Sequence, residues 1–249
     1  MSIDPLAIGL SGLNAYGTQI DVSANNVANV GTAGFAGQNV TFADMLAGVS
    51  VAGIGTNPAP GALEPAGGPT DLAISGTGFF VLQGPGGGVT FTRAGDFSTG
   101  ANGELVNAAS GFALLGTSGQ PIVIPAGVRD LAIGANGTVT GTLPSGQTAT
   151  LGRIALATFA NPGGLIPVGG GYRASAASGA AQFGAPATAG YGSLVSGVLE
   201  SANVDLGDEL VKMIAAQAAF EANAKSVRTG DQDLKTAVDL DSEGPTAPD

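Results

Sequence analysis

The 249-residue sequence contains no cysteine, no histidine and no tryptophan, and these absences exclude several kinds of chemistry. Without histidine the chain lacks the side chain that most often acts as a general base near neutral pH. Without cysteine it has neither a thiolate nucleophile nor a disulfide, and without both residues it lacks the usual ligands of zinc and other transition metals. We therefore expect no metal site and no cofactor.

Positive charge is also scarce, because 8 Lys and Arg stand against 19 Asp and Glu and give a net charge of −11 at pH 7. The basic residues are scattered singly, so no cluster is available to neutralise nucleic-acid phosphates. The longest uncharged run, residues 174–199, is interrupted by polar residues, glycine and proline, which argues against membrane insertion. The first residues lack the basic segment of a cleaved secretory signal, so we expect a cytoplasmic location or export without one.

A helical pattern is present at the end of the chain, over residues 203–240, with one register spaced alternately four and three residues apart. Its positions are Leu206, Leu210, Met213, Gln217, Phe220, Ala224, Val227, Asp231, Leu234 and Val238. Asn203 or Asp205 is suited to cap the start of this helix, and Pro245 lies beyond its end. Such a seam allows a helix to pack along another helix for several turns.

A second pattern with the same spacing occupies the beginning of the chain. Its positions are Ile3, Leu6, Leu10, Leu13, Gly17, Ile20, Ala24 and Val27. Asp4 followed by Pro5 is a helix start signal, and turn residues follow in the segment 29–34. Two such stripes are explained if the helices pair as a coiled coil, or if each covers a different face of one core, and periodicity alone leaves both explanations open.

The glycine content of the first helix indicates that contacts with other subunits are needed to stabilise it. Gly9, Gly12 and Gly17 lie inside the first helix, and each destabilises it by about 1 kcal/mol relative to alanine. The remaining faces of both helices carry small and polar residues instead of long charged ones, which allows neighbours to approach closely. We infer that these helices are marginal alone and are buried by other subunits.

The middle of the chain has a different pattern. Pro58, Pro60, Pro65 and Pro69 indicate an extended connector, because proline prevents both a long helix and a central strand. After it, short β-branched and aromatic runs alternate with glycine turns, as in an antiparallel all-β domain. The pairs Asn102-Gly103 and Asn136-Gly137 predict type I′ hairpins. We predict an α+β chain in which an N-terminal helix in 1–34 and a C-terminal helix in 193–240 pair as a coiled coil. Between them we predict an extended connector in 35–70 and an inserted antiparallel β domain in 71–192, and an acidic tail follows in 241–249.

Candidates for catalysis are weak, and we expect no enzyme. Asp96 and Glu104 are predicted to face each other across a hairpin, where they could form a carboxylate pair, but ordinary hairpins carry such charges. Residues 84–88 are glycine-rich without a following lysine and predict a hairpin loop instead of a phosphate site. Gly76 and Gly78 predict a bulge or a close backbone approach within a strand. The acids at the C-terminus lack the spacing of a calcium loop.

Several segments resemble one known family. Residues 11–35, SGLNAYGTQIDVSANNVANVGTAGF, resemble the amino-terminal signature of the bacterial flagellar rod and hook axial proteins, and residues 196–234 resemble the carboxy-terminal signature. The segments DLAISGTGFFVL at 71–82 and TRAGDF at 92–97 are similar to the family's β domain. The motif residues are Asn25, Asn26, Asn29, Gly34 and Phe35.

The resemblance implies a structural subunit that polymerises helically, through its terminal helices, into a hollow torque-transmitting shaft. It implies export through the flagellar export apparatus, a location in the periplasm-spanning rod of the basal body, and copies of itself and other rod and hook proteins as partners. Within the family the chain most resembles distal rod members. A proximal rod subunit and a short hook-type subunit are alternatives, because FADMLAG at residues 42–48 is hook-like.

We predict that the large apolar residues of the two helical patterns pack between the helices or between subunits. They are Leu6, Leu10, Leu13, Ile20, Val27, Leu206, Leu210, Met213, Phe220, Val227 and Leu234. A different class of function is a secreted β-rich binding module whose helices only trimerise, and a third is a β-rich hydrolase.

Overall fold

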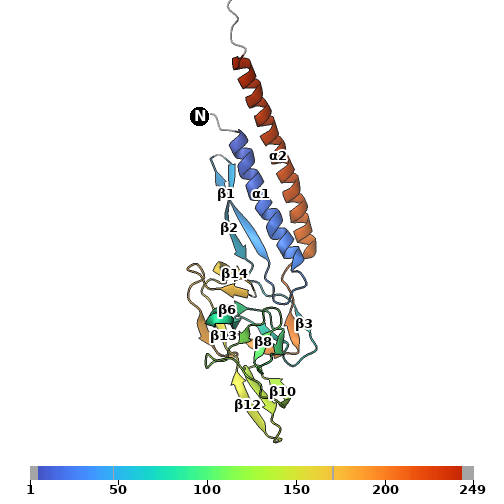
Figure 1. Cartoon of the computed structure of the whole chain (residues 1–249), viewed down its shortest axis with the longest axis vertical. Helices are drawn as coiled ribbons and strands as arrows, with labels where there is room; N and C mark the ends of the chain where they lie inside the picture. The colour runs from blue at the N-terminus through green and yellow to red at the C-terminus, as the bar shows by residue number, and fades with distance from the viewer. Residues whose placement is uncertain (1–4, 47, 170, 243–249) are drawn as a thin grey trace, which may run out of the picture. The chain divides into compact units, whose positions relative to one another are not determined.

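The computed structural model describes residues 5–46, 48–169 and 171–242 (Figure 1). The chain divides into two compact units. The first, which we call the helical unit, comprises residues 1–28, 38–55 and 205–249, and the second, the β unit, comprises residues 29–37 and 56–204. The architecture is α+β, with a helix near each end of the chain and antiparallel sheets in between.

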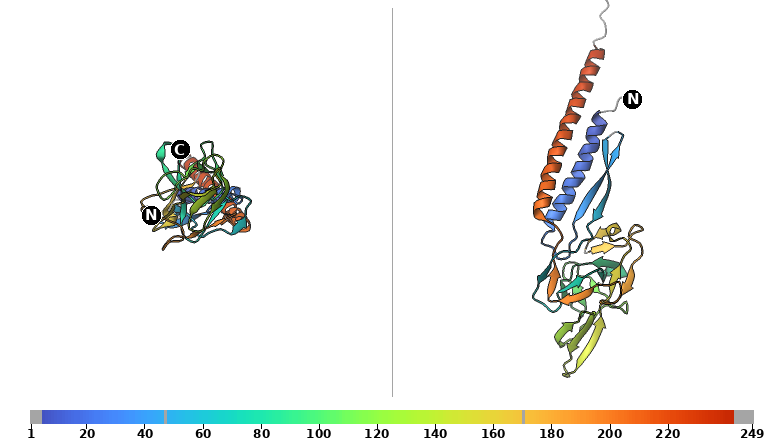
Figure 2. Two further views of the ribbon diagram at one scale, coloured as in Figure 1. Left: turned by 90° about the horizontal axis from the view of Figure 1, so that it is seen from below. Right: turned by 180° about the vertical axis from the view of Figure 1, so that it is seen from behind.

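The helical unit contains the two long helices, α1 (Pro5–Ala28) and α2 (Leu206–Ser242), which lie side by side in the views of Figures 1 and 2. A hairpin of β1 (Gln38–Met45) and β2 (Gly48–Thr56) forms a two-stranded sheet, and β1 contacts α1. Asp205 caps α2 as predicted, because its Oδ1 accepts hydrogen bonds from the N–H groups of Gly207 at 2.8 Å and Asp208 at 3.1 Å. Asp4, Ile3 and Pro245 lie outside the described residues.

The segment 35–70 is more regular than the extended connector that we predicted. It contains the whole β1–β2 hairpin and the short strand β3 (Leu63–Pro65), which pairs with β18 (Val198–Glu200). The prediction rested on four prolines, and all four follow the hairpin in the sequence. Residues 38–56 contain no proline, so nothing in that part prevents strand pairing.

The β unit is built on a nine-stranded sheet in which β14, β15, β6, β5, β9, β8 and β7 are successive neighbours, and β13 joins β5 to β16. These strands are β5 (Phe79–Gln83), β6 (Val89–Thr92), β7 (Phe97–Thr99), β8 (Leu105–Asn107), β9 (Ala113–Leu114), β13 (Leu156–Thr158), β14 (Ile166–Val168), β15 (Gly171–Arg173) and β16 (Gln182–Gly184). Two short 3₁₀ helices lie between strands, η1 (Pro85–Gly87) between β5 and β6 and η2 (Pro162–Gly164) between β13 and β14. The first lies in the loop that we predicted for the glycine-rich segment.

Smaller sheets complete the β unit. The strands β10 (Arg129–Ile133), β11 (Thr138–Thr142) and β12 (Thr148–Arg153) form a three-stranded sheet, and β4 (Leu72–Ser75) pairs with β17 (Ser193–Ser196). Every pairing between named strands of this unit is antiparallel, as the alternating sequence pattern predicted.

Strand β5 lies between the two hydrophobic clusters of the β unit. Phe80 and Leu82 belong to one cluster and Val81 to the other, because successive side chains of a strand point to opposite faces. The first cluster also contains Leu72, Leu105, Leu114 and Ile154, and the second contains Phe91, Phe159 and Tyr172. The β unit therefore has a core of its own.

The turns predicted at Asn102-Gly103 and Asn136-Gly137 are present, but they are not type I′. Gly103 and Gly137 have φ of 80° and 81°, whereas neither asparagine is among the residues with positive φ. Type I′ requires positive φ at both central residues, so the asparagines here occupy ordinary positions and only the glycine is left-handed. Gly76 and Gly78 lie between β4 and β5, and not inside a strand as predicted.

Candidate assembly interface

Two glycines set the contact between α1 and α2. A Cβ atom on Gly9 would lie 2.7 Å from Val227 Cγ2 and 3.3 Å from the carbonyl oxygen of Asn223, and one on Gly12 would lie 2.4 Å from Asn223 Oδ1. Any larger residue would force the helices or these side chains apart. Gly17 differs, because its Cβ would lie 3.7 Å from Phe220, which is an ordinary contact.

The face of α2 that is turned inward differs in part from the predicted seam. Its buried and half-buried side chains are Glu209, Met213, Ala216, Ala219, Asn223, Ala224 and Val227. Met213 and Val227 belong to the predicted set, but Leu206, Leu210 and Leu234 are exposed, and Phe220 is 38% exposed. The prediction followed a strict four-and-three register through the apolar residues, whereas Asn223 and Val227 are the residues that face Gly9 and Gly12.

On α1 the predicted residues are mostly half-buried. Leu6, Leu13, Ile20 and Val27 belong to this class, and Leu10 is exposed. The most buried positions of α1 are instead Gly9, Gly12, Ala15, Val22, Ser23 and Asn26. As on α2, the small residues are turned inward and a large apolar residue is left outside.

The motif residue Asn26 has a clear structural role. Its side chain is 1% exposed and binds both backbone groups of Gln38 at the start of β1. The Nδ2 group donates to the Gln38 carbonyl oxygen at 2.8 Å, and Oδ1 accepts from the Gln38 N–H at 2.8 Å. This paired hydrogen bond mimics a strand neighbour and joins the end of α1 to the hairpin. Asn25 is exposed on the same turn.

Glu209 is a buried carboxylate in the same unit. Its Oε1 accepts a hydrogen bond from Lys212 Nζ at 2.7 Å. Burial alone raises the pKa of Glu209, but the hydrogen bond from Lys212 and the nearby polar side chains of Asn26 and Ser23 outweigh it, and the net pKa lies below its ordinary value of 4.5. The charged carboxylate therefore stabilises the helical unit above about pH 4.5, and this contribution is lost as the pH falls through the lowered pKa.

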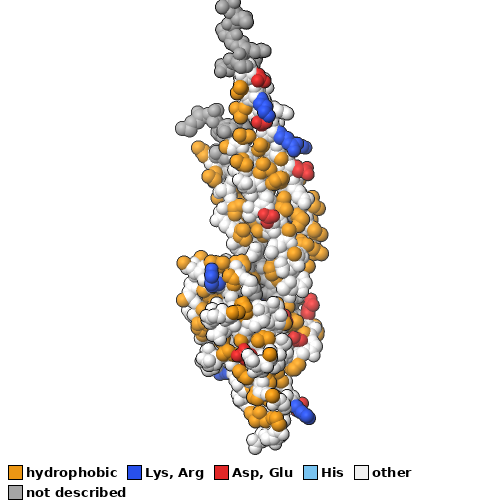
Figure 3. Space-filling model, in the orientation of Figure 1, with side chains coloured by type: hydrophobic (Ala, Val, Ile, Leu, Met, Phe, Trp, Pro, Cys, Tyr) orange, Lys and Arg blue, Asp and Glu red, His pale blue; other side chains and the backbone are white. Residues whose placement is uncertain are grey.

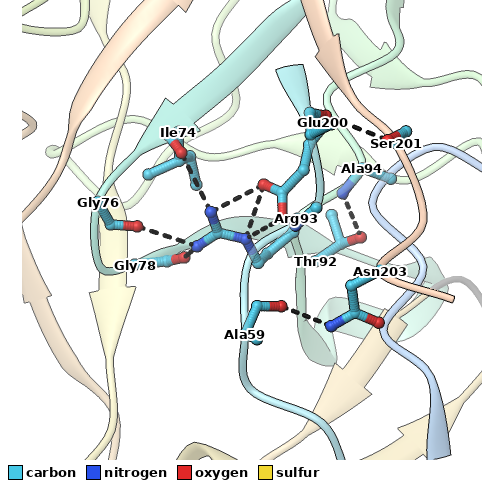
Figure 4. Close-up of polar contacts among 12 residues, drawn as sticks. Ala59, Ile74, Gly76, Gly78, Thr92, Arg93, Ala94, Glu200, Ser201 and Asn203 are labelled. Carbon is cyan, nitrogen blue, oxygen red and sulfur yellow. Dashed lines mark hydrogen bonds and ion pairs between the residues drawn. The ribbon is translucent and has the colours of Figure 1, made fainter. Parts of the chain in front are cut away.

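A buried ion pair in the β unit was not foreseen from the sequence. The Arg93 guanidinium contacts Glu200, with Nη2 2.8 Å from Oε2 and Nε 2.9 and 2.8 Å from the two carboxylate oxygens (Figure 4). Its other N–H groups donate to the carbonyl oxygens of Ile74, Gly76 and Gly78. Each guanidinium donor therefore has an acceptor, which compensates for burial of the charge.

Contacts around this ion pair explain why several nearby positions are occupied by glycine. Gly76 and Gly78 have φ of 110° and 138°, a backbone conformation that directs their carbonyl groups to Arg93 and that side chains rarely adopt. Gly34 has φ of 64°, its N–H donates to the Glu200 carbonyl oxygen at 2.7 Å, and a Cβ there would lie 2.2 Å from Ala94 N. The close backbone approach that we predicted for Gly76 and Gly78 is therefore present, although in a turn.

The N-terminal and C-terminal motifs meet within the β unit. Besides the bond from Gly34 to Glu200, the Asn203 N–H donates to the Phe35 carbonyl oxygen at 3.2 Å, and Asn203 Oδ1 accepts from the Gly37 N–H at 2.7 Å. Asn203 was predicted as one of two possible helix caps, and this is its observed role instead. Phe35 is half-buried, and Asn29 accepts a backbone hydrogen bond from Thr32 at 2.9 Å that closes the turn after α1.

The predicted carboxylate pair is not formed. The register of β7 and β8 pairs Phe97 with Asn107, which places Asp96 beside Asn107 and leaves Glu104 at the opposite end of the hairpin. Asn107 Nδ2 donates to Asp96 Oδ1 at 2.7 Å. Burial raises the pKa of Asp96 above its ordinary value of 3.8, although the hydrogen bonds from its own backbone and from Asn107 oppose this.

No helix among the described residues combines the length and the apolar character needed to cross a membrane.

Family models match three parts of the chain. The model described as Flagella basal body rod protein matches residues 6–35, and Flagellar hook protein FlgE/F/G D1 domain matches residues 73–141. Flagellar basal body rod FlgEFG protein C-terminal matches residues 195–240. The first and last of these contain Asn26, Gly34, Glu200 and Asn203, and the middle one contains Arg93.

Whole-length relatives agree with these matches. The flagellar basal-body rod protein FlgG of Bacillus subtilis is 38% identical over 93% of this chain and 97% of the relative. The protein of the same name from Caulobacter vibrioides is 35% identical over 95% of this chain and 99% of the relative. The flagellar hook protein FlgE of Escherichia coli is 37% identical, but over 61% of this chain and 35% of the relative. The chain therefore belongs to the flagellar basal-body rod protein family and is FlgG-like over nearly its whole length.

Proposed function

We propose that this chain is a distal-type subunit of the flagellar basal-body rod, which polymerises helically into a hollow shaft that transmits torque. The end-to-end match to rod proteins supports a rod subunit over a hook subunit, because the hook relative aligns over only 35% of its own length. In this proposal the partners are further copies and other rod and hook proteins. The role is structural and involves no catalysis.

The observation that carries the proposal is an exposed apolar stripe on the first turns of α2. It consists of Leu206, Leu210, Val211 and Ile214, which are 45, 44, 67 and 66% exposed. Figure 3 shows hydrophobic side chains gathered in this part of the helix. Covering a fully exposed side chain of this size stabilises a contact by roughly 1.5–3 kcal/mol. We infer that α2 uses this stripe to bind neighbouring subunits.

The helix pair supports the proposal in a second way. The buried and half-buried positions 209, 213, 216, 219, 223, 227 and 230 of α2 are separated by three or four residues, the spacing that allows one helix to pack along another. We propose that α1 and α2 form a short coiled coil of this kind. A Cβ on Gly230 would lie 3.9 Å from the backbone nitrogen of Leu6, and beyond that point Leu234 and Val238 of α2 are exposed. This extension supplies apolar surface for a further subunit.

The glycine content of α1 is compatible with export of a partly unfolded chain. Helix formation is unfavourable for isolated segments with several glycines, so α1 depends on its contacts with α2 and with neighbouring subunits. We propose that the subunit passes through the flagellar export apparatus with its ends unfolded, that these ends pair as α1 and α2 after export, and that neighbouring subunits stabilise the pair further on assembly.

The proposal is tested by Leu210→Asp in the purified full chain. A carboxylate in the stripe would have to lose its water against an apolar partner, which costs a few kcal/mol, so we expect polymers to be absent by light scattering and electron microscopy. The circular dichroism of the chain should be unchanged, because Leu210 is exposed in the single subunit. Thr229→Asp is the control, since it adds the same charge at an exposed polar position of α2. Normal polymerisation of Leu210→Asp would contradict the proposal.

A further inference from the structure

A groove of about 660 Å³ on the β unit has no role in the contacts described above. Its floor is made by the buried residues Val81, Leu115 and Ala155, which belong to one of the two core clusters. Its walls include Phe183 and Val89, which are 59 and 38% exposed. At roughly 30 Å³ per water molecule, the groove has room for several side chains of a partner.

The chemistry of the groove is apolar with one positive charge. Among the described residues that line the groove, Arg153 is the one that carries a charge, and the lining also includes the hydroxyl-bearing residues Thr117 and Ser118. The Nε group of Arg153 donates to the Asn136 carbonyl oxygen at 2.9 Å, which fixes the base of the side chain. Such a groove fits a segment that presents an apolar side chain next to a carboxylate.

One wall of the groove is also a sheet edge. Strand β16 pairs with β13 and with no other named strand of the described chain, so its second edge is unpaired. Phe183 lies at the centre of β16 and is among the most exposed large apolar residues of the β unit. Exposed apolar side chains on an edge strand are a common site of association between chains.

The β unit also carries a surface feature with the complementary chemistry. Glu104 and Val123 form an isolated antiparallel bridge, so their side chains lie next to each other on one face. Val123 is 43% exposed. The Glu104 carboxylate has no hydrogen bond or ion pair within the part of the chain that the structure describes. We call these two residues the Glu104–Val123 pair.

We propose that the groove of one subunit binds the Glu104–Val123 pair of a second copy, with Glu104 facing Arg153 and Val123 packing on Val89 and Phe183. The inference rests on the proposed rod function and identifies a contact between β units that adds to the helix contacts. The two surfaces are different parts of the same chain. A contact of this type leaves one groove and one pair free at the ends, and it extends into an open helical polymer when the rotation between copies does not close a ring.

The test is a charge exchange in the purified full chain, read as the critical concentration for polymerisation. Arg153→Glu and Glu104→Arg each place like charges opposite one another, and each should raise the critical concentration by about tenfold. The double variant restores an attractive pair in every contact and should return the critical concentration to that of the original chain. Arg129→Glu, at an exposed arginine outside the groove, is the matched control and should have little effect.

Thermal unfolding of each variant verifies that the β unit stays folded, which is needed because Arg153 also holds the Asn136 turn. If neither single variant changes assembly while Leu210→Asp abolishes it, the groove contact is wrong and the proposed function stands. If both single variants weaken assembly and the double variant does not recover, the Glu104–Val123 pair is not the occupant. If the unaltered chain forms no polymer at all, the proposed function itself fails.

Discussion

Replacing three glycines of α1 by alanine, one at a time, should have three different effects on stability. Gly→Ala inside a helix is worth about 1 kcal/mol through helix propensity alone. At Gly17 the new methyl group would lie 3.7 Å from Phe220, which is an ordinary contact, so the full gain of about 1 kcal/mol is expected. Gly17 therefore serves as the reference for the other two positions.

At Gly9 the gain is opposed by contacts that cannot easily move. The methyl group would lie 2.7 Å from Val227 Cγ2, a stiff β-branched side chain, and 3.3 Å from the backbone oxygen of Asn223. Overpacking of this kind costs about 1–3 kcal/mol, so Gly9→Ala should be up to about 2 kcal/mol less stable than the original chain.

At Gly12 the clash falls on the Asn223 side chain, which can turn away but then loses the 2.8 Å hydrogen bond from its Nδ2 to the Ala219 carbonyl oxygen. A hydrogen bond of this type is worth about 0.5–1.5 kcal/mol, so the net change should be near zero.

Urea unfolding followed by circular dichroism at 222 nm, below the concentration at which polymers form, measures all three variants. The expected order of stability is Gly17→Ala, then Gly12→Ala, then Gly9→Ala. If the three variants gain the same stability, helix propensity alone is at work, and the packing of α1 against α2 in the single subunit is refuted.

Three other substitutions, the first with Gly31→Ala as its matched control, test the β unit by the same unfolding measurement. Gly34→Ala should lose more than about 2 kcal/mol, because it combines left-handed strain with a backbone clash, whereas Gly31→Ala has open space and should change stability by less than about 0.5 kcal/mol; equal effects would contradict this. Glu200→Gln should cost about 3–5 kcal/mol, because Arg93 stays buried without its counter-charge, and a loss below 1 kcal/mol would refute it. Asp96→Asn should stabilise the chain at pH 7, because ionising the Asp96 carboxyl above its raised pKa lowers the stability of the folded chain. The gain should vanish below about pH 3.8, where the carboxyl is protonated in both the folded and the unfolded chain. A gain in stability that increases on acidification would mean that folding lowers the pKa of Asp96 and would contradict this prediction.

Much of the fold follows from hydrophobic periodicity. The spacing of the apolar residues located both terminal helices, and the change to short alternating runs located the antiparallel sheets. The β1–β2 hairpin was missed because the prolines at residues 58–69 dominated the interpretation of the whole segment. The turn type at Asn102 and Asn136 was wrong because the dipeptide signal does not specify which of its two residues takes the positive φ.

The polar contacts of the β unit could not be predicted in this way. Arg93 and Glu200 are 107 residues apart, and nothing in their local sequence indicates that they meet. Gly34 and Phe35 were quoted in a motif without a role, and Asn203 was predicted as a possible helix cap. Their observed hydrogen bonds become evident only when both segments are seen together. A possible signal was Arg93 itself, because it lies within a strand-rich segment and a buried arginine requires a carboxylate partner.

The inward and outward faces of α2 explain why the predicted seam was displaced. Asn223 and Val227 of the inner face lie against Gly9 and Gly12, whereas Leu210, Val211 and Ile214 remain exposed in the single subunit. A search for the most apolar stripe assumes that a chain buries its largest apolar residues within itself. Under the proposed function that assumption fails, because neighbouring subunits complete the outer face of α2. In such a chain, exposed leucine and isoleucine on a helix indicate the assembly surface, and the glycines indicate the contact within the subunit.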